Sequence, residues 1–405
     1  MIKKLYSSYL DSFRGLPVEA WWLALITLIN RSGTMVIPFL SLYLTKEKDF
    51  SLGQVGWIMT AFGAGSIAGA YLGGKISDKI GPYKTMVFSL FSSGLFYILT
   101  QFAQDFWQII LMVFMVVLLA DIFRPASFAA LRSYTDHTNR TRSTSLIRLA
   151  INLGFSAGPA VGGYLIYTYG YHSLFWVDGI TSILAMGLMI LVLRPKENNP
   201  EQTSKEPQAS ESAYKDKEFL GFILALIFFA FAFLQYFSTI PYYYNEDYGL
   251  TEKEVGILMG FNGFLVFIIE MPVVHYFEKK KKGDLPYVYL GAILLFFSFL
   301  VLQIGHHVAL LWIGMTLMSF AEVIAFPFAN SYALNRSHRG LVGQYMALFS
   351  LSFSIGHIFA HNGGFQLIHQ FGFPITWWFM AIICLIVVFM LYWLKQKEKH
   401  GTDHS

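Results

Sequence analysis

Charged side chains occur at several points where the surrounding sequence is apolar. They are Arg31, Asp121, Arg124, Arg148, Asp178, Glu270 and Glu322. An ionisable group within hydrocarbon is costly and usually marks a function. A carboxyl group in such a place can take up and release a proton, and a guanidinium can hold an anion. We therefore predict proton coupling through Glu322, Asp121 and Glu270, and substrate binding at Arg31.

Each of these charges also has a structural interpretation. Asp121 and Arg124 are three residues apart and share a helix face, so they form either an ion pair or a proton-linked switch. Arg31 faces either a substrate anion or a buried acid such as Glu322. Arg148 either extends to the membrane surface or pairs with Asp121.

The remaining candidates are open to more than one interpretation. Asp178 lies near the outer end of its apolar run, which favours a solvated or helix-capping role over a functional one. Glu270 suits a gate or a structural ion pair. His357 and His361 are one helical turn apart and suit pore lining or a proton or substrate contact, and no metal site is predicted. The aromatic stretch 228–244 lines either a cavity or a lipid-facing belt. The other predicted substrate contacts are Asn30, Gln235, Tyr236, Asn262 and His357.

The composition requires a lipid environment for most of the chain. Of its 405 residues, 55% are hydrophobic and 13% are charged, whereas soluble domains carry about 25% charged residues. A run of about 20 apolar residues spans the hydrocarbon core of a bilayer. Such runs lie at 19–44, 53–75, 83–103, 106–130, 143–167, 172–194, 218–245, 252–277, 285–304, 308–332, 342–368 and 374–394. We therefore predict an all-α membrane protein with twelve transmembrane helices in two six-helix bundles.

The distribution of positive charges predicts the orientation of these helices. With both termini in the cytoplasm, the outside loops hold only Lys46, Lys48 and Lys253 among the lysines and arginines. This is the asymmetry that membrane proteins show. A stretch rich in Pro, Ser, Glu and Lys divides the chain and is typical of a flexible linker. The expected parts are an N-terminal bundle at 1–194, the cytoplasmic linker at 195–217 and a C-terminal bundle at 218–405.

An internal repeat relates the two halves at a spacing of 200 residues. Residues 51–59, SLGQVGWIM, align with residues 251–259, TEKEVGILM. With the spacing increased by one, Asp121 aligns with Glu322, and a proline follows each of them. In repeat-built transporters the substrate site lies between the repeats near the midplane. We therefore expect Asp121 and Glu322 to be counterparts.

The loop after the second apolar run carries a family signature. Residues 74–84, GKISDKIGPYK, resemble the G-x-L-x-D-R-x-G-R-K signature of the major facilitator superfamily. In that family the aspartate caps a helix end and pairs with arginine, which latches the cytoplasmic side. The alternative is an ordinary turn whose charged side chains are solvated. The resemblance implies a conformational latch formed by Gly74, Asp78, Lys79, Gly81, Arg124 and Arg148.

Three shorter elements resemble particular branches of that superfamily. Residues 321–327 are similar to the G-E-x-x-x-x-P pattern of multidrug:proton antiporters, whose glutamate here is Glu322. Residues 27–31, TLINR, keep only the arginine of the E-x-x-E-R motif of proton-coupled oligopeptide transporters. An element similar to G-x-x-x-G-P-x-x-G-G of drug:proton antiporters, or else generic small-residue packing, is formed by Gly154, Gly158, Pro159, Gly162 and Gly163.

These observations predict a secondary active transporter and not an enzyme. The leading expectation is proton-coupled antiport that exports small amphipathic compounds by alternating access, in a bacterial inner membrane. One alternative is a proton-coupled symporter for peptides or another polar nutrient, and another is a receptor that keeps the fold but moves nothing. The expected partners are the lipid bilayer, a small-molecule substrate and protons. We expect a monomer with no cofactor, no metal and no nucleic-acid partner.

Overall fold

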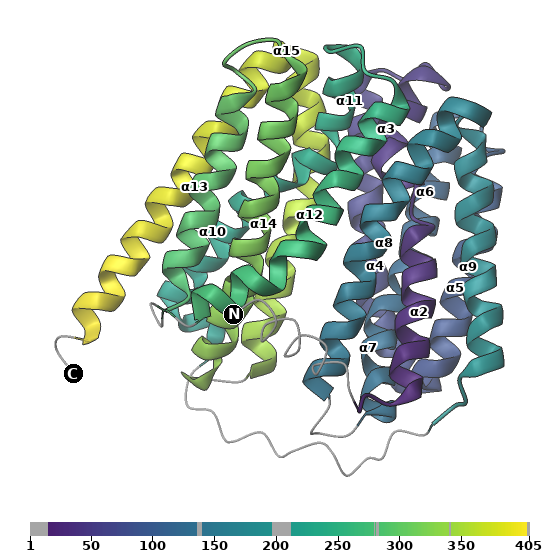
Figure 1. Cartoon of the computed structure of the whole chain (residues 1–405), viewed down its shortest axis with the longest axis horizontal. Helices are drawn as coiled ribbons and strands as arrows, with labels where there is room; N and C mark the ends of the chain where they lie inside the picture. The colour runs from purple at the N-terminus through teal and green to yellow at the C-terminus, as the bar shows by residue number, and fades with distance from the viewer. Residues whose placement is uncertain are drawn as a thin grey trace, which may run out of the picture. The chain divides into compact units, whose positions relative to one another are not determined.

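The structure is a computed structural model that describes residues 15–135, 140–196, 212–278, 280, 283–339 and 342–402. Every secondary-structure element in these ranges is helical (Figure 1). The helices of the N-terminal half are α2 (Val18–Ser32), α3 (Val36–Lys46), α4 (Leu52–Ile80), α5 (Pro82–Thr100), α6 (Phe106–Asp121), α7 (Phe123–Tyr134), α8 (Arg140–Tyr169) and α9 (His172–Val192).

The helices of the C-terminal half begin after the expected linker, of which residues 197–211 lie outside the described residues. They are η2 (Ala213–Lys215), α10 (Lys217–Phe233), η3 (Leu234–Phe237), α11 (Thr239–Glu246), α12 (Glu252–Glu278), α13 (Leu285–Val301), α14 (Val308–Arg336), η4 (Ser337–Arg339) and α15 (Val342–Thr402).

Nine helices in the described ranges are long and apolar enough to cross a membrane, by length and composition. Helices α5 and α13 occupy two further predicted spans but are not among the nine. The last two predicted spans are joined in α15, in which Gly372 departs from helical geometry with φ 75° and ψ 178°. The chain is therefore an all-helical multi-pass membrane protein, and the count of twelve helices stays a prediction.

The chain divides into two compact units. The first unit holds the described residues of Met1–Ile37 and Ala61–Thr203, and the second holds those of Pro38–Thr60 and Ser204–Ser405. Most of α3 and the start of α4 thus belong to the same unit as the C-terminal helices. The predicted bundle boundaries at residues 194 and 218 stay a prediction.

Three polar contacts within the second unit hold α3 and the segment after it. The Lys46 Nζ atom is 3.1 Å from Glu252 Oε1, and Ser41 Oγ donates a hydrogen bond to the Ser238 carbonyl at 3.2 Å. Gln366 Nε2 donates to the Gly53 carbonyl at 3.3 Å. The beginning of α4 is therefore tied to α15.

The core of the first unit forms around α2. Helix α2 packs against α8 and α9, and α5 packs against α6 and α9. Ala20, Leu23 and Ile26 on α2 are fully buried together with Phe123 and Met189. These residues follow the three-to-four spacing of a helix face, which explains why α2 turns that face inward.

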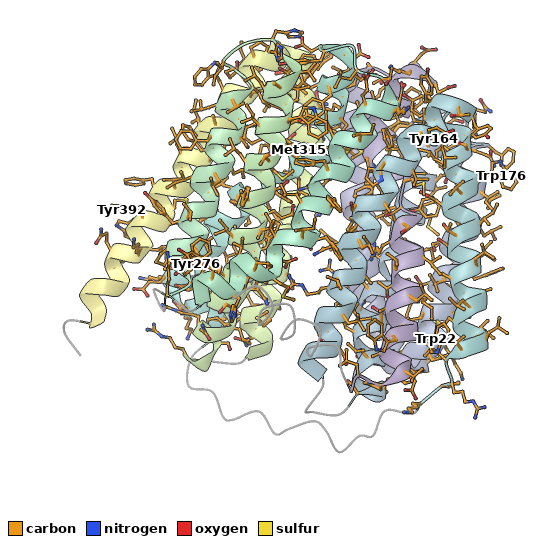
Figure 2. All side chains as sticks on the ribbon, in the orientation of Figure 1. Trp22, Tyr164, Trp176, Tyr276, Met315 and Tyr392 are labelled. Atoms are coloured by element: carbon orange, nitrogen blue, oxygen red, sulfur yellow. The ribbon has the colours of Figure 1, made fainter. Side chains whose placement is uncertain are left out.

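The outer surfaces of the helices are apolar, as a lipid environment requires. Tyr164, Trp176, Tyr276 and Tyr392 are labelled in Figure 2, and each is between 46% and 56% exposed. Leu191 is 84% exposed. A water-facing surface rarely shows so many large apolar side chains, so these faces are expected to contact lipid.

A cluster of ion pairs joins the start of α10 to the end of α14. Arg336 donates to Asp216 through Nε at 2.8 Å and through Nη2 at 2.9 Å, and it also pairs with Glu218. The Tyr345 hydroxyl donates to Asp216 at 3.1 Å. Burial raises the pKa of Asp216, but the hydrogen bonds from Arg336 and from the Phe219 amide outweigh it and lower that pKa below the ordinary value. We call this group the Asp216–Arg336 clasp.

Candidate functional site

Arg31 is the centre of a polar cluster inside the first unit. It lies in the last turn of α2, where the negative end of a helix dipole favours a cation. Arg31 is 9% exposed, and its Nε atom has no hydrogen-bond partner among the described residues. Its guanidinium carbon lies 5.7 Å from the centre of the Phe155 ring. A buried cation with a free donor can bind a negatively charged group.

Asp121 supplies a negative charge to the same cluster. It ends α6 and accepts a hydrogen bond from the Ser66 hydroxyl on α4. The charges of Asp121 and Arg124 both act on Arg31. In the described part of the chain Asp121 and Arg124 form no ion pair, because the chain leaves α6 at Ile122 and Arg124 is exposed at the start of α7. The predicted ion pair between them is therefore absent from this structure.

Asp178 and Tyr97 were not predicted as site residues, yet both belong to this cluster. The charges of Arg31, Asp121 and Asp178 all act on Tyr97, which is buried on α5. Asp178 is fully buried and accepts hydrogen bonds from the backbone N–H groups of Met35 and Val36, at 3.0 and 2.9 Å. Of its two predicted roles, capping is confirmed and solvation is wrong. We call Arg31, Tyr97, Asp121 and Asp178 the first-unit cluster.

A second polar cluster lies inside the second unit. Asn262 on α12 donates through Nδ2 to Glu322 Oε2 on α14 at 3.1 Å and to Ser319 Oγ at 2.9 Å. The charge of Glu270 also acts on Glu322. We call Asn262, Glu270, Ser319 and Glu322 the second-unit cluster. Asn262 was predicted as a substrate contact, and in this structure it holds the carboxyl group of Glu322.

The two clusters follow the internal repeat. Asp121 and Glu322 occupy aligned positions, and each accepts a hydrogen bond from a side chain on the repeat-related helix, α4 or α12. The donors differ, because Ser66 serves Asp121 and Asn262 serves Glu322. The predicted correspondence of the two acids thus extends to their surroundings.

Gln235 and Tyr236 are both buried in the second unit. Gln235 is fully buried, donates to the carbonyls of Phe231 and Ala360 at 3.0 and 2.8 Å, and accepts from Thr239 Oγ1 at 2.7 Å. Tyr236 is also fully buried. The hydrogen bonds of Gln235 connect η3 to α10 and α15, and the role of both residues as substrate contacts stays a prediction.

The other predicted contacts take different positions. Asn30 is buried beside Arg31 in α2. His357 Nδ1 lies 3.3 Å from His361 Nε2 on α15, with His361 buried and His357 half-buried. Such a spacing fits one shared proton between the two rings, since the donor and acceptor roles depend on the tautomers.

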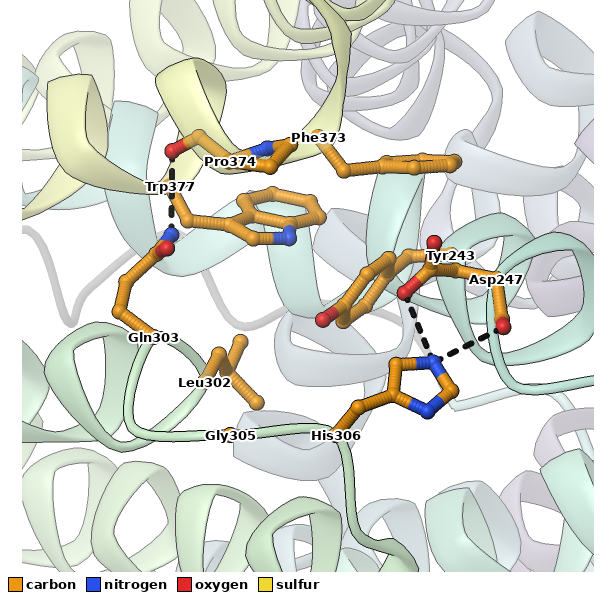
Figure 3. A pocket seen from close by; sticks show the side chains of 9 residues that line it. All are labelled: Tyr243, Asp247, Leu302, Gln303, Gly305, His306, Phe373, Pro374 and Trp377. Atoms are coloured by element: carbon orange, nitrogen blue, oxygen red, sulfur yellow. Dashed lines mark hydrogen bonds and ion pairs between the residues drawn. The ribbon is translucent and has the colours of Figure 1, made fainter.

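A small pocket of about 160 Å³ lies in the second unit, where the end of α11, the loop after α13 and α15 meet (Figure 3). Tyr243, Phe373 and Trp377 form aromatic walls. At the rim, His306 Nε2 lies 3.2 Å from Asp247 Oδ2. None of the predicted substrate contacts is among its lining residues in the described structure.

Comparison with known proteins identifies the family. The sequence model described as Major Facilitator Superfamily matches residues 21–361. This chain belongs to that superfamily. The predicted family is thereby confirmed, and with it the assignment to membrane transport.

Major facilitator relatives cover nearly the whole chain. A Na(+), Li(+), K(+)/H(+) antiporter of Planococcus maritimus is 23% identical, over 90% of this chain and 93% of its own. Multidrug resistance protein 1 of Bacillus subtilis is 23% identical, over 80% of this chain and 83% of its own. The crystal structure of a POT family transporter in complex with 5-aminolevulinic acid has a TM-score of 0.81, with 14% identity over 95% of this chain and 97% of that chain. This last likeness shows the fold.

The major facilitator signature loop makes the predicted turn without the predicted pairing. Gly81 caps α5 with φ 87°, a conformation that glycine permits. Asp78 and Lys79 are exposed, and Asp78 forms no hydrogen bond or ion pair with the described residues. Gly74 has open space around it. Arg148 is exposed on α8, and the latch stays a prediction.

The element similar to that of antiporters packs against Arg31. A Cβ atom on Gly154 would lie 2.6 Å from Arg31 Cβ, and one on Gly158 would lie 3.3 Å from the Ser32 carbonyl oxygen. Pro159 lies inside the helix α8, and Gly162 and Gly163 are buried. The small residues therefore let α8 approach α2 at the cluster that holds Arg31, which the sequence comparison alone did not indicate.

Proposed function

We propose that this protein is a proton-coupled antiporter that exports small, partly apolar compounds carrying a negative group, by alternating access. The observation that carries the proposal is the hydrogen bond from Asn262 to the buried carboxyl group of Glu322, on which the charge of Glu270 also acts. Ionising two neighbouring carboxyl groups away from water costs more than ionising one. Such a pair suits a site that gains and loses one proton as it meets each side of the membrane.

Arg31 gives the proposal its substrate chemistry. A buried guanidinium with an available donor suits a carboxylate or a similar anion, and the ring of Phe155 near it suits an apolar body. A zwitterionic or anionic compound would satisfy both. The proposal for direction rests on the relatives, since those reported above include an antiporter and a multidrug resistance protein.

The test is transport in liposomes with an imposed pH gradient. The probe is norfloxacin, a fluorescent zwitterion with an apolar body. With the lumen acidic, protons leave the lumen through the carrier, and antiport should accumulate norfloxacin inside. Depletion of norfloxacin along the proton flux would support instead the alternative, a proton-coupled symporter. Glu322→Gln protein in the same liposomes is the matched control.

Exchange of alkali cations for protons is a second candidate. The relative from Planococcus maritimus carries that activity in its name, and hydrogen bonds gather the Glu322 carboxylate, the Asn262 amide and the Ser319 hydroxyl. Oxygen atoms of these kinds are the ligands that hard cations prefer. Proton movement that needs Na⁺, Li⁺ or K⁺ in the same liposomes, with no norfloxacin present, would favour this function. Proton movement that needs norfloxacin would exclude it as the main activity.

We further propose twelve transmembrane helices with both termini in the cytoplasm of a bacterial cell, in the inner membrane, and a monomeric protein. The hydrophobic runs and the positive-charge asymmetry support this topology. Accessibility of single cysteines placed at residues 48 and 253 tests it, in a background with Cys384 replaced. A membrane-impermeant thiol reagent added outside the cell should label both sites, and labelling only after the membrane is permeabilised would contradict the topology.

A further inference from the structure

The first membrane span is interrupted next to Arg31. Helix α2 ends at Ser32 and α3 begins at Val36, although both belong to one apolar segment, Val18–Lys46. An interruption leaves backbone N–H groups without helical partners, and each must be satisfied within the protein because lipid offers no hydrogen bonds. The question is which group satisfies them here.

Asp178 on α9 accepts hydrogen bonds from two of these backbone N–H groups. Its Oδ1 atom accepts from the Met35 N–H at 3.0 Å and its Oδ2 atom accepts from the Val36 N–H at 2.9 Å. The carboxylate therefore lies at the start of α3, where the helix dipole is positive. One side chain at 0% exposure thus fixes the direction in which the chain restarts.

Two close approaches of neighbouring helices also confine the backbone around the interruption. A Cβ atom on Gly33 would overlap the hydroxyl of Thr181, one turn after Asp178 on α9. Gly154 on α8 touches Arg31 in the same way. Arg31 is thus the last charged residue before a backbone break that α9 holds on one side and α8 on the other.

We propose that Asp178 is the residue that positions Arg31 for the substrate. Asp178 acts through the backbone of residues 33–36: the break that it holds sets where α2 ends, and so where the Arg31 guanidinium points. The functional meaning of this inference rests on the proposed function, in which Arg31 binds the negative group of the substrate. Its structural meaning does not, and the experiment separates the two.

Asp178→Asn removes one of the two carboxylate acceptors with almost no change in size. In the full-length protein in detergent, amide hydrogen exchange in residues 33–37 should then accelerate by roughly tenfold or more, since a local opening becomes easier. The rate at which phenylglyoxal modifies Arg31, followed by mass spectrometry, should change severalfold. Thr239→Val, which removes a hydroxyl contact at the other interrupted span, is the matched control and should alter neither quantity.

A second variant guards against loss of folding. Gly33→Ala keeps every charge but drives a methyl group into Thr181, so it should change the Arg31 modification rate in the same way. If Asp178→Asn and Gly33→Ala both leave the exchange of residues 33–37 and the modification of Arg31 as in the wild type, the inference is wrong.

A double-mutant cycle on norfloxacin binding tests whether the positioning of Arg31 by Asp178 affects function. Asp178→Asn should weaken binding by about tenfold in the wild-type background and have no further effect in Arg31→Gln, because residues that act through one another are not additive. Additive losses would show that Asp178 does not act through Arg31. If norfloxacin does not bind the wild type, the proposed substrate class fails, whereas exchange and modification still decide the positioning role.

Discussion

The two polar clusters carry their acids at aligned positions of the repeat but surround them with different charges. In the first unit, Asp121 shares its cluster with the fixed cation of Arg31. In the second unit, Glu322 has a second acid, Glu270, near it and a neutral amide as its hydrogen-bond partner. The first-unit cluster thus includes a fixed cation, whereas the second-unit cluster consists of two acids, an amide and a hydroxyl.

This difference suggests a division of roles between the units. The first-unit cluster offers a permanent positive charge, which suits a substrate anion. The second-unit cluster offers a buried carboxyl group that is hydrogen-bonded to a neutral amide, which suits a proton. A transporter that couples a proton to a substrate must bind both in alternation. Substitutions in the first-unit cluster should therefore impair substrate binding, and substitutions in the second-unit cluster should impair proton coupling.

The largest effect is expected for Glu322→Gln. The glutamine keeps the size of the side chain and its contact with Asn262, but it cannot release a proton. Uptake of norfloxacin driven by a pH gradient in liposomes should be abolished, while the melting temperature of the purified protein changes little. Gradient-driven uptake at the wild-type rate would show that the proton is carried elsewhere.

Arg31→Gln should have the next largest effect. Removing one partner of a buried charge pair costs about 2–5 kcal/mol, so norfloxacin binding should weaken by roughly 30-fold to several thousandfold. Arg31→Lys keeps the charge but loses the planar donor arrangement, and it should lose less. Equal affinity of wild type and Arg31→Gln, measured by calorimetry, would remove Arg31 from the site.

A smaller effect is expected for Asp121→Asn. Asparagine can still accept a hydrogen bond from Ser66, and loss of the negative charge leaves Arg31 more available to an anion. Norfloxacin binding should therefore change by no more than severalfold, and gradient-driven uptake should persist. Complete loss of gradient-driven uptake would give Asp121 the same role as Glu322 and would break the comparison.

The smallest effect on transport is expected at the Asp216–Arg336 clasp. Arg336→Gln removes the buried partner of Asp216, so the melting temperature should fall by several degrees, with norfloxacin uptake per folded molecule unchanged. The lowered pKa of Asp216 means that its stabilising effect is present above the ordinary aspartate range, about pH 3.9, and is lost as pH falls through its lowered pKa. Asp216 therefore does not titrate between pH 5 and 8, and a pH dependence of transport there must come from another group. A shift of that profile in Arg336→Gln would contradict this.

The sequence predicted the helices and the aligned acids because both depend on local or repeated patterns. Long apolar runs predict spans directly, and the repeat aligns Asp121 with Glu322. It did not predict the partners of these acids, since Ser66 and Asn262 are ordinary polar residues on helices rich in small or apolar side chains. Only the packing of α4 against α6 and of α12 against α14 brings them together.

The contacts of Asp178 and Gln235 could not be predicted from the sequence, because both side chains bond to backbone groups. The partners of Asp178 are backbone N–H groups that become available only because the first span is interrupted. Gly33, with Pro38 shortly after it, is the signal that could have indicated this break. Gln235 was predicted as a substrate contact because it is a polar residue among aromatic ones. In the structure its amide nitrogen donates hydrogen bonds to two backbone carbonyl groups.

Norfloxacin exchange at equal pH on both sides of the liposome membrane tests the division of roles most directly. This exchange needs substrate binding and alternating access but no net proton movement. Glu322→Gln should retain exchange while losing gradient-driven uptake, and Arg31→Gln should lose both. Loss of exchange in Glu322→Gln with its fold intact, or retention of gradient-driven uptake in Arg31→Gln, would contradict the assignment of the proton to one unit and the substrate anion to the other.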